Sequence, residues 1–165
     1  MIAKELKPVL EDSIEFSVEQ HFDVLQEAVL KKISAKKIEN LHNMAYVYYQ
    51  NKYYEDADAF FRLLTKLKPE NIHYWKGLGA CLQMKKNYQD ALLCYHHAQN
   101  ILGESPDAYL YVHIADCHFA MKQSEQGFEI LTLAKKRAVN DKKIIHHIAF
   151  MHERWKKKKK LTANH

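Results

Sequence analysis

The sequence predicts an all-α solenoid, in which three helical hairpins lie between an N-terminal helix and a C-terminal capping helix. A pattern that recurs three times and a scarcity of turn residues predict this fold. Only 4 glycines and 3 prolines occur in 165 residues, which argues against a turn-rich β-sandwich. Hydrophobic residues make up 47% of the chain, enough to form a core. We therefore expect one domain over residues 1–165.

The recurring pattern appears when three stretches are aligned without internal gaps. They are "LHNMAYVYYQNKYYEDADAFFRLLTKLKP", "WKGLGACLQMKKNYQDALLCYHHAQNILG" and "YVHIADCHFAMKQSEQGFEILTLAKKRAV". Their spacing fits the tetratricopeptide repeat (TPR), W-x2-L-G-x2-Y followed by A-x3-F and P, with a period of about 34 residues. The sequence thus predicts TPR hairpins at residues 38–71, 72–107 and 108–140.

Two positions of the repeat always carry a small residue. The eighth and twentieth residues, which we expect to let the paired helices approach closely, are Ala45, Gly79 and Ala115, and Ala57, Ala91 and Gly127. Cap signals agree with the same phase, because Asn87 precedes the second helix of the middle repeat and Ser105 precedes Pro106.

Amphipathic segments flank the repeats. A helix at residues 16–34 carries Phe22, Leu25 and Val29 on one face, and we expect it to cap the stack or to form a dimer interface. A helix at residues 141–160 has an apolar stripe that should cover the open end of the last repeat. This stripe consists of Ile144, Ile148, Met151 and Trp155.

The net charge of +5 is concentrated in the run Lys156–Lys160. We interpret this run as a solvated tail, and contact with RNA or an anionic membrane is the minor alternative. No apolar run approaches the roughly 18–20 residues that span a bilayer. The start "MIAKELKPVLEDSIEF" lacks the apolar stretch of a signal peptide. We expect a cytosolic protein that neither inserts into membranes nor binds nucleic acid.

The histidines and cysteines, which could act in catalysis or bind a metal, form no recognisable catalytic or metal site. His96-His97 and His146-His147 are adjacent on predicted helices, so their side chains point about 100° apart and do not chelate one ion. The cysteines are odd in number and form no C-x-x-C motif, which favours reduced, packed thiols. We therefore expect no enzyme activity, no metal and no cofactor.

Beside its core-facing residues, the first helix of each hairpin carries a second stripe of side chains, and this stripe indicates a peptide-binding surface. In a solenoid of hairpins the first helices line the concave surface, where aromatic and partly polar side chains suit an extended peptide with apolar anchors. The alternative is that these rings pack against the protein's own N-terminal segment. The predicted groove residues are His42, Tyr46, Tyr49, His73, Lys76, Ala80, Gln83, Met84, Tyr109, Val112, Asp116 and Phe119.

The middle repeat carries the most specific resemblance to a known family. "YWKGLGACLQMKKNYQDALLCYHHAQNI", with the run Gly77–Cys81 and the hairpin Tyr88–Ala91, resembles the class II type III secretion chaperones. "ADCHF", Ala115–Phe119, is similar to the third repeat of that family. The resemblance covers roughly residues 14–140 and does not include the lysine-rich end.

The resemblance implies a bacterial, cytosolic, non-enzymatic chaperone that holds hydrophobic translocator proteins. It also implies dimerisation through the N-terminal helical region, and groove anchors at Tyr46, Tyr49, Tyr109 and Phe119. The alternative is a generic TPR adaptor that grips another protein's peptide, for example its terminal carboxylate. Such a clamp needs several cationic or amide side chains, and only Lys76, Gln50 and Gln83 qualify.

Overall fold

The computed structural model describes residues 33–103 and 107–163, with side chains up to residue 158. The chain divides into two compact units, residues 1–40 and 41–165, and the account below concerns the second. Residues 16–32 of the predicted N-terminal helix, which include Phe22, Leu25 and Val29, lie outside the described residues, as does Ser105.

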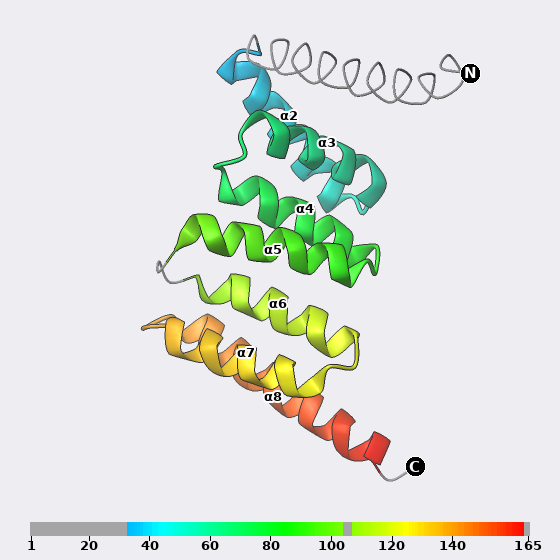
Figure 1. The fold of residues 1–165 in the computed structure, drawn as a ribbon, viewed down its shortest axis with the longest axis vertical. Coiled ribbons are helices and arrows are strands. Elements are labelled where there is room, and N and C mark those ends of the chain that lie inside the picture. Colours follow the sequence, from blue (N-terminus) through cyan, green and yellow to red (C-terminus); the bar gives the residue numbers. More distant parts are fainter. Residues whose placement is uncertain (1–32, 104–106, 164–165) are drawn as a thin grey trace, which may run out of the picture. The chain divides into compact units, whose positions relative to one another are not determined.

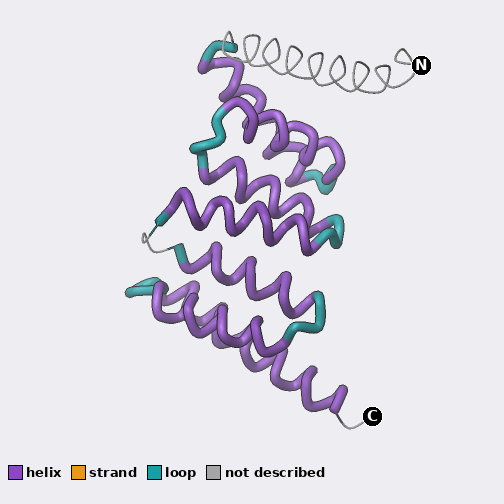
Figure 2. The backbone as a smooth tube through the Cα atoms, viewed as in Figure 1, coloured by secondary structure: helices purple, strands orange, loops and turns teal. Residues whose placement is uncertain are grey.

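All regular structure in the described residues is helical (Figure 2). Each hairpin pairs two helices of similar length across a short turn, and the C-terminal helix packs against both helices of the last hairpin (Figure 1). No described helix is long and apolar enough to cross a membrane. The predicted repeat fold is thereby confirmed, with α2 (Ala35–Gln50), α3 (Tyr54–Leu67), α4 (Ile72–Met84), α5 (Tyr88–Leu102), α6 (Ala108–Ala120), α7 (Ser124–Arg137) and α8 (Lys142–Ala163).

The small residues of the repeat lie where helices meet. All four alanines at these positions are fully buried. A Cβ atom built on Gly79 would stand 2.6 Å from the ring of Tyr95, and one on Gly127 would stand 2.6 Å from the ring of Phe119. The two glycines therefore leave the space that these large rings fill, as the repeat pattern predicts.

Each hairpin turns through a lysine with a left-handed backbone. The φ angles of Lys52, Lys86 and Lys122 are 64°, 63° and 64°. In each turn the amide of the next residue donates to the carbonyl five residues before it, at 2.9 Å, as in a Schellman motif. Glycine or asparagine normally occupies this position, so the three identical lysine turns are a feature that propensity alone does not predict.

Side-chain caps begin several of the described helices, and Asn71 caps α4 by accepting from the His73 amide at 2.9 Å. Asn87 caps α5 as predicted, accepting from the Asp90 amide at 3.4 Å. The cap of α6 is Asp107, which accepts from the Leu110 amide at 3.1 Å, and this corrects the prediction of Ser105. Asp141 accepts from the amides of the first turn of α8. An aspartate directly before the first helical residue satisfies the free amides without a proline between them.

The predicted stripe of α8 lies in the core. Ile144, Ile148 and Met151 are 1–4% exposed, and Trp155 packs against the same cluster. Their partners belong to α6 and α7, among them Leu131. The end of the last hairpin is thus covered by α8, which confirms the predicted capping role of the C-terminal helix.

Candidate functional site

A cavity of about 350 Å³ opens where α2, α3 and α4 meet. Half of the twelve predicted groove residues line it, and Phe61 and Gly77 complete the wall. We call this space the anchor cavity; its predicted members are His42, Tyr46, Tyr49, His73, Lys76 and Ala80. Its volume is at the lower end for ligand sites, which suits one or two side chains of a peptide.

The wall of the anchor cavity is mainly aromatic. The ring of His42 lies 5.2 Å from that of Tyr74 and 6.2 Å from that of Phe61, measured between centroids. Burial lowers the pKa of His42, and the nearby His73 lowers it further. A neutral imidazole packed among rings presents an apolar surface. A Cβ at Gly77 would overlap the Phe61 ring, so this glycine lets the phenylalanine reach the cavity.

Polar side chains from α4 to α6 form a row of two hydrogen-bonded groups, which begins at Lys76 in the wall of the anchor cavity. The Lys76 ammonium donates to Asp107 Oδ2 at 2.7 Å. Burial alone would raise the pKa of Asp107, but Lys76 and two backbone amides hold that pKa below its usual value. Gln83 Nε2 donates to Asp116 Oδ2 at 3.3 Å. The side-chain oxygen Oε1 of Gln83 in turn accepts from the Tyr95 hydroxyl at 2.8 Å.

Asp116 lies at the far end of this row, next to α8. Burial raises its pKa, while the charges of His113, Arg154 and His147 act in the opposite direction. Arg154 and His147 belong to α8, which contacts α6.

Four predicted groove residues lie elsewhere. Val112 and Phe119 are 6% and 2% exposed and belong to the core that α8 covers. The Phe119 ring stacks on Trp155 with centroids 4.8 Å apart. This corrects the expectation that both side chains are open to a ligand. Met84 and Tyr109 are exposed but do not line the anchor cavity.

Sequence reasoning missed several residues that shape this region. Phe61 and Gly77 line the anchor cavity, although neither belongs to the predicted groove stripe. Asp107 pairs with Lys76, and its place directly before α6 was a recognisable cap signal. His113, stacked 5.5 Å from Tyr95, belongs to neither stripe of α6, so the pattern gave no signal for it.

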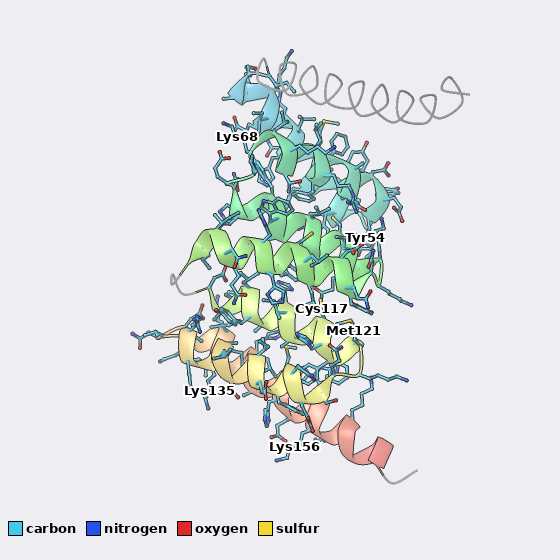
Figure 3. The ribbon with its side chains drawn as sticks, viewed as in Figure 1. Tyr54, Lys68, Cys117, Met121, Lys135 and Lys156 are labelled. Carbon is cyan, nitrogen blue, oxygen red and sulfur yellow. The ribbon has the colours of Figure 1, made fainter. Side chains whose placement is uncertain are left out.

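The three cysteines are free and buried, and Figure 3 labels one of them, Cys117 of α6. Burial raises the pKa of Cys81 and Cys117 to about 12 and that of Cys94 to about 11. Thiols with such values stay protonated at neutral pH and are weak nucleophiles. In residues 33–103 and 107–163, no three histidines, cysteines or carboxylates gather closely enough to hold a metal ion.

Comparisons with known proteins agree with this architecture. A tetratricopeptide repeat family model matches residues 38–71 and 72–101. The Low calcium response locus protein H of Yersinia pestis is 31% identical over 90 residues, which cover 54% of this chain and 52% of that protein. The chain thus matches about half the length of this curated relative.

Solved structures extend the similarity. The type III secretion translocator chaperone SycD of Yersinia enterocolitica, in a form described as an alternative dimer, superposes with a TM-score of 0.71 at 27% identity. This match covers 78% of this chain and 98% of SycD. SycD bound to a peptide of the translocator YopD gives a TM-score of 0.70, with the same identity and coverage. The chain is therefore similar in sequence to type III secretion translocator chaperones and carries the same tetratricopeptide-repeat fold.

Proposed function

We propose that this protein is a cytosolic bacterial chaperone without enzyme activity. It binds an extended segment of a hydrophobic translocator protein and keeps that partner soluble and competent for secretion. The face formed by α2, α4 and α6 supplies the binding groove. The partner's apolar side chains enter the anchor cavity, and its backbone lies along the polar row.

The anchor cavity is the observation that carries this proposal. It is an aromatic recess at the positions where sequence spacing alone predicts a ligand-facing stripe. The homologous SycD structure with a YopD peptide supports an extended peptide as the ligand. Aromatic anchors of this kind commonly dominate the binding energy of protein interfaces.

The alternative, an adaptor that grips a terminal carboxylate, finds less support. Lys76 is the one lysine or arginine among the residues that line the anchor cavity. Its ammonium is already paired with Asp107 at 2.7 Å. A carboxylate ligand would have to replace that bond, which removes most of the gain. The apolar wall therefore favours an apolar anchor over a charged chain end.

Replacing Tyr46 by alanine should weaken partner binding without unfolding the protein. The Tyr46 side chain lines the anchor cavity and is 56% exposed, so its loss removes ligand contacts and little core packing. We expect the dissociation constant for a translocator segment to rise roughly 10- to 100-fold, as for an interface hot spot. Co-expression with translocator candidates from the same genome gives the partner, and calorimetry gives the constant.

Tyr53→Ala is the matched control, because it removes the same side chain at 59% exposure from a position outside the anchor cavity. Its affinity should stay within about twofold of the unmodified protein. Equal losses in the two variants, or unchanged partner solubility with Tyr46→Ala, would count against the groove.

We further propose a homodimer formed through Phe22, Leu25 and Val29, three residues outside the described part. The amphipathic spacing of these residues and the dimer described for SycD support this proposal. Leu25→Glu should convert the dimer to a monomer, because it places a charge in an apolar contact. Light scattering coupled to gel filtration measures the mass, and a monomer for the unmodified protein would contradict the proposal.

A further inference from the structure

The basic character of α8 has no role in the function proposed above. Residues 142–158 contain six lysines or arginines and a single acidic residue, Glu153. One stripe of the helix is committed to the core through residues such as Ile148 and Met151. The charges therefore lie on the two flanks of this stripe, and the flanks have different neighbours.

Helical geometry separates the two flanks. At 100° per residue, Arg154 and His147 fall within about 20° of each other on one side of the buried stripe. Since α8 contacts both α6 and α7 and its other side lies against α7, this side is the one turned toward α6. Lys156 falls on the opposite side, about 160° from Arg154. That side also carries Ile145 and Ala149, which line a separate cavity between α7 and α8.

The Arg154 flank and the anchor cavity lie along one continuous face. Lys76 and Ala80 of α4 line the cavity, and Gln83 follows on the same helix and reaches Asp116 of α6. The helices α4 and α6 are in contact, as are α6 and α8. With neighbouring axes about 8–10 Å apart, α4 and α8 are separated by roughly 20 Å, which an extended peptide crosses in about six residues.

We infer that the α8 flank of Arg154 and His147 is a second subsite of the groove, which selects peptides with acidic residues about six positions from their apolar anchor. This inference rests on the proposed function, since it extends the same bound peptide. Arg154 and His147 are exposed, so they reach a ligand without any rearrangement of the core. The attraction between the positive charge on α8 and the acidic residues of the peptide also orients the peptide and speeds its association.

An acidic peptide fits this flank better than a nucleic acid or a lipid surface does. The flank is a short strip of α8 that carries Arg154 and His147, whereas nucleic acids favour a broad basic face. The opposite flank, with Lys156, borders the cavity between α7 and α8 and lies outside this face. The proposed subsite is thus defined by the flank of α8 on which Arg154 and His147 lie. The total charge of the helix does not define it.

Three fluorescent 14-residue peptides in a Gly/Ser background test the inference with the full-length protein. One carries Leu-Val-Leu at positions 2–4 and Glu-Glu-Glu at positions 9–11, a second has Gln-Gln-Gln in place of the glutamates, and a third has Ser-Ser-Ser in place of the anchor. At low salt the Glu peptide should bind about fivefold more tightly than the Gln peptide, as expected for exposed charge pairs. This ratio should approach one in 1 M salt.

Two variants that remove one positive charge from α8 locate the effect. Arg154→Gln should abolish most of the preference for glutamate, and Lys156→Gln should keep it. An equal loss in both variants, or equal binding of the Glu and Gln peptides, would overturn the inference. So would tighter Arg154-dependent binding of a 14-nucleotide single-stranded DNA or of phosphatidylserine vesicles.

The anchor reports separately on the proposed function. Tyr46→Ala should weaken the binding of both Leu-Val-Leu peptides by the same factor. The ratio of affinities for the Glu and Gln peptides should stay unchanged. If both bind through Tyr46 with no preference for glutamate, the inference fails and the proposed function stands. If the Ser-Ser-Ser peptide binds as tightly as its Leu-Val-Leu counterpart and depends on Arg154, the proposed anchor fails. Binding of none of the peptides would contradict both.

Discussion

Replacing Phe119 by alanine should lower the free energy of unfolding by about 3–5 kcal/mol. The ring is 2% exposed, stacks on Trp155 at 4.8 Å and meets Phe128 edge-on at 5.0 Å. Gly127 leaves the space into which the ring fits, so truncation opens a cavity that its glycine neighbour cannot fill. Urea or guanidinium unfolding followed by circular dichroism measures the loss.

Tyr109→Ala is the matched control for this prediction. It truncates an aromatic residue on the same helix, α6, but at 47% exposure, so we expect a change of about 1 kcal/mol or less. Similar losses in the two variants would contradict the buried position of Phe119. Because Phe119→Ala acts on the core, a loss of partner binding in that variant does not identify a groove contact. Tyr46 is the informative position for binding.

The hairpins were predictable because their signal is local and repeated. A small residue where helices cross has to recur in every hairpin, and Ala45, Gly79 and Ala115 recur in register. Their buried positions follow from that spacing without any knowledge of long-range contacts. The turns at Lys52, Lys86 and Lys122 also recur in every hairpin. They were not predicted, because glycine or asparagine usually occupies a left-handed position of this kind.

The candidate site was only partly predictable, since exposure depends on contacts between distant segments. The second stripe is open at α2 and α4, where Tyr46 and His73 reach the anchor cavity. At α6 the same stripe lies under α8, and Val112 and Phe119 are buried there. The buried stripe of α8 packs against apolar residues of both α6 and α7, and the α6 stripe supplies part of that surface. Matching these two stripes would have predicted the difference.

Replacing Gly79 by valine should destabilise the protein by about 2–3 kcal/mol through overpacking. A Cβ atom at this position would stand 2.6 Å from the ring of Tyr95, and valine adds two further methyl groups. The Tyr95 ring has no free space, because it is 0% exposed and stacks on His113 at 5.5 Å. Its hydroxyl is also fixed by the 2.8 Å hydrogen bond to Gln83.

A double-mutant cycle with Tyr95→Leu separates this steric conflict from the intrinsic cost of valine in a helix. Leucine removes the ring against which valine collides. The double variant should therefore lose at least about 1 kcal/mol less stability than the sum of the losses in the two single variants. Ala59→Val, at an exposed position of α3, gives the helix-propensity cost alone, below about 0.7 kcal/mol. Strictly additive losses would mean that Tyr95 does not set the limit at Gly79. A deficit from additivity would show that this one ring holds α4 and α5 at their close approach, and so holds Gln83 in the polar row of the groove.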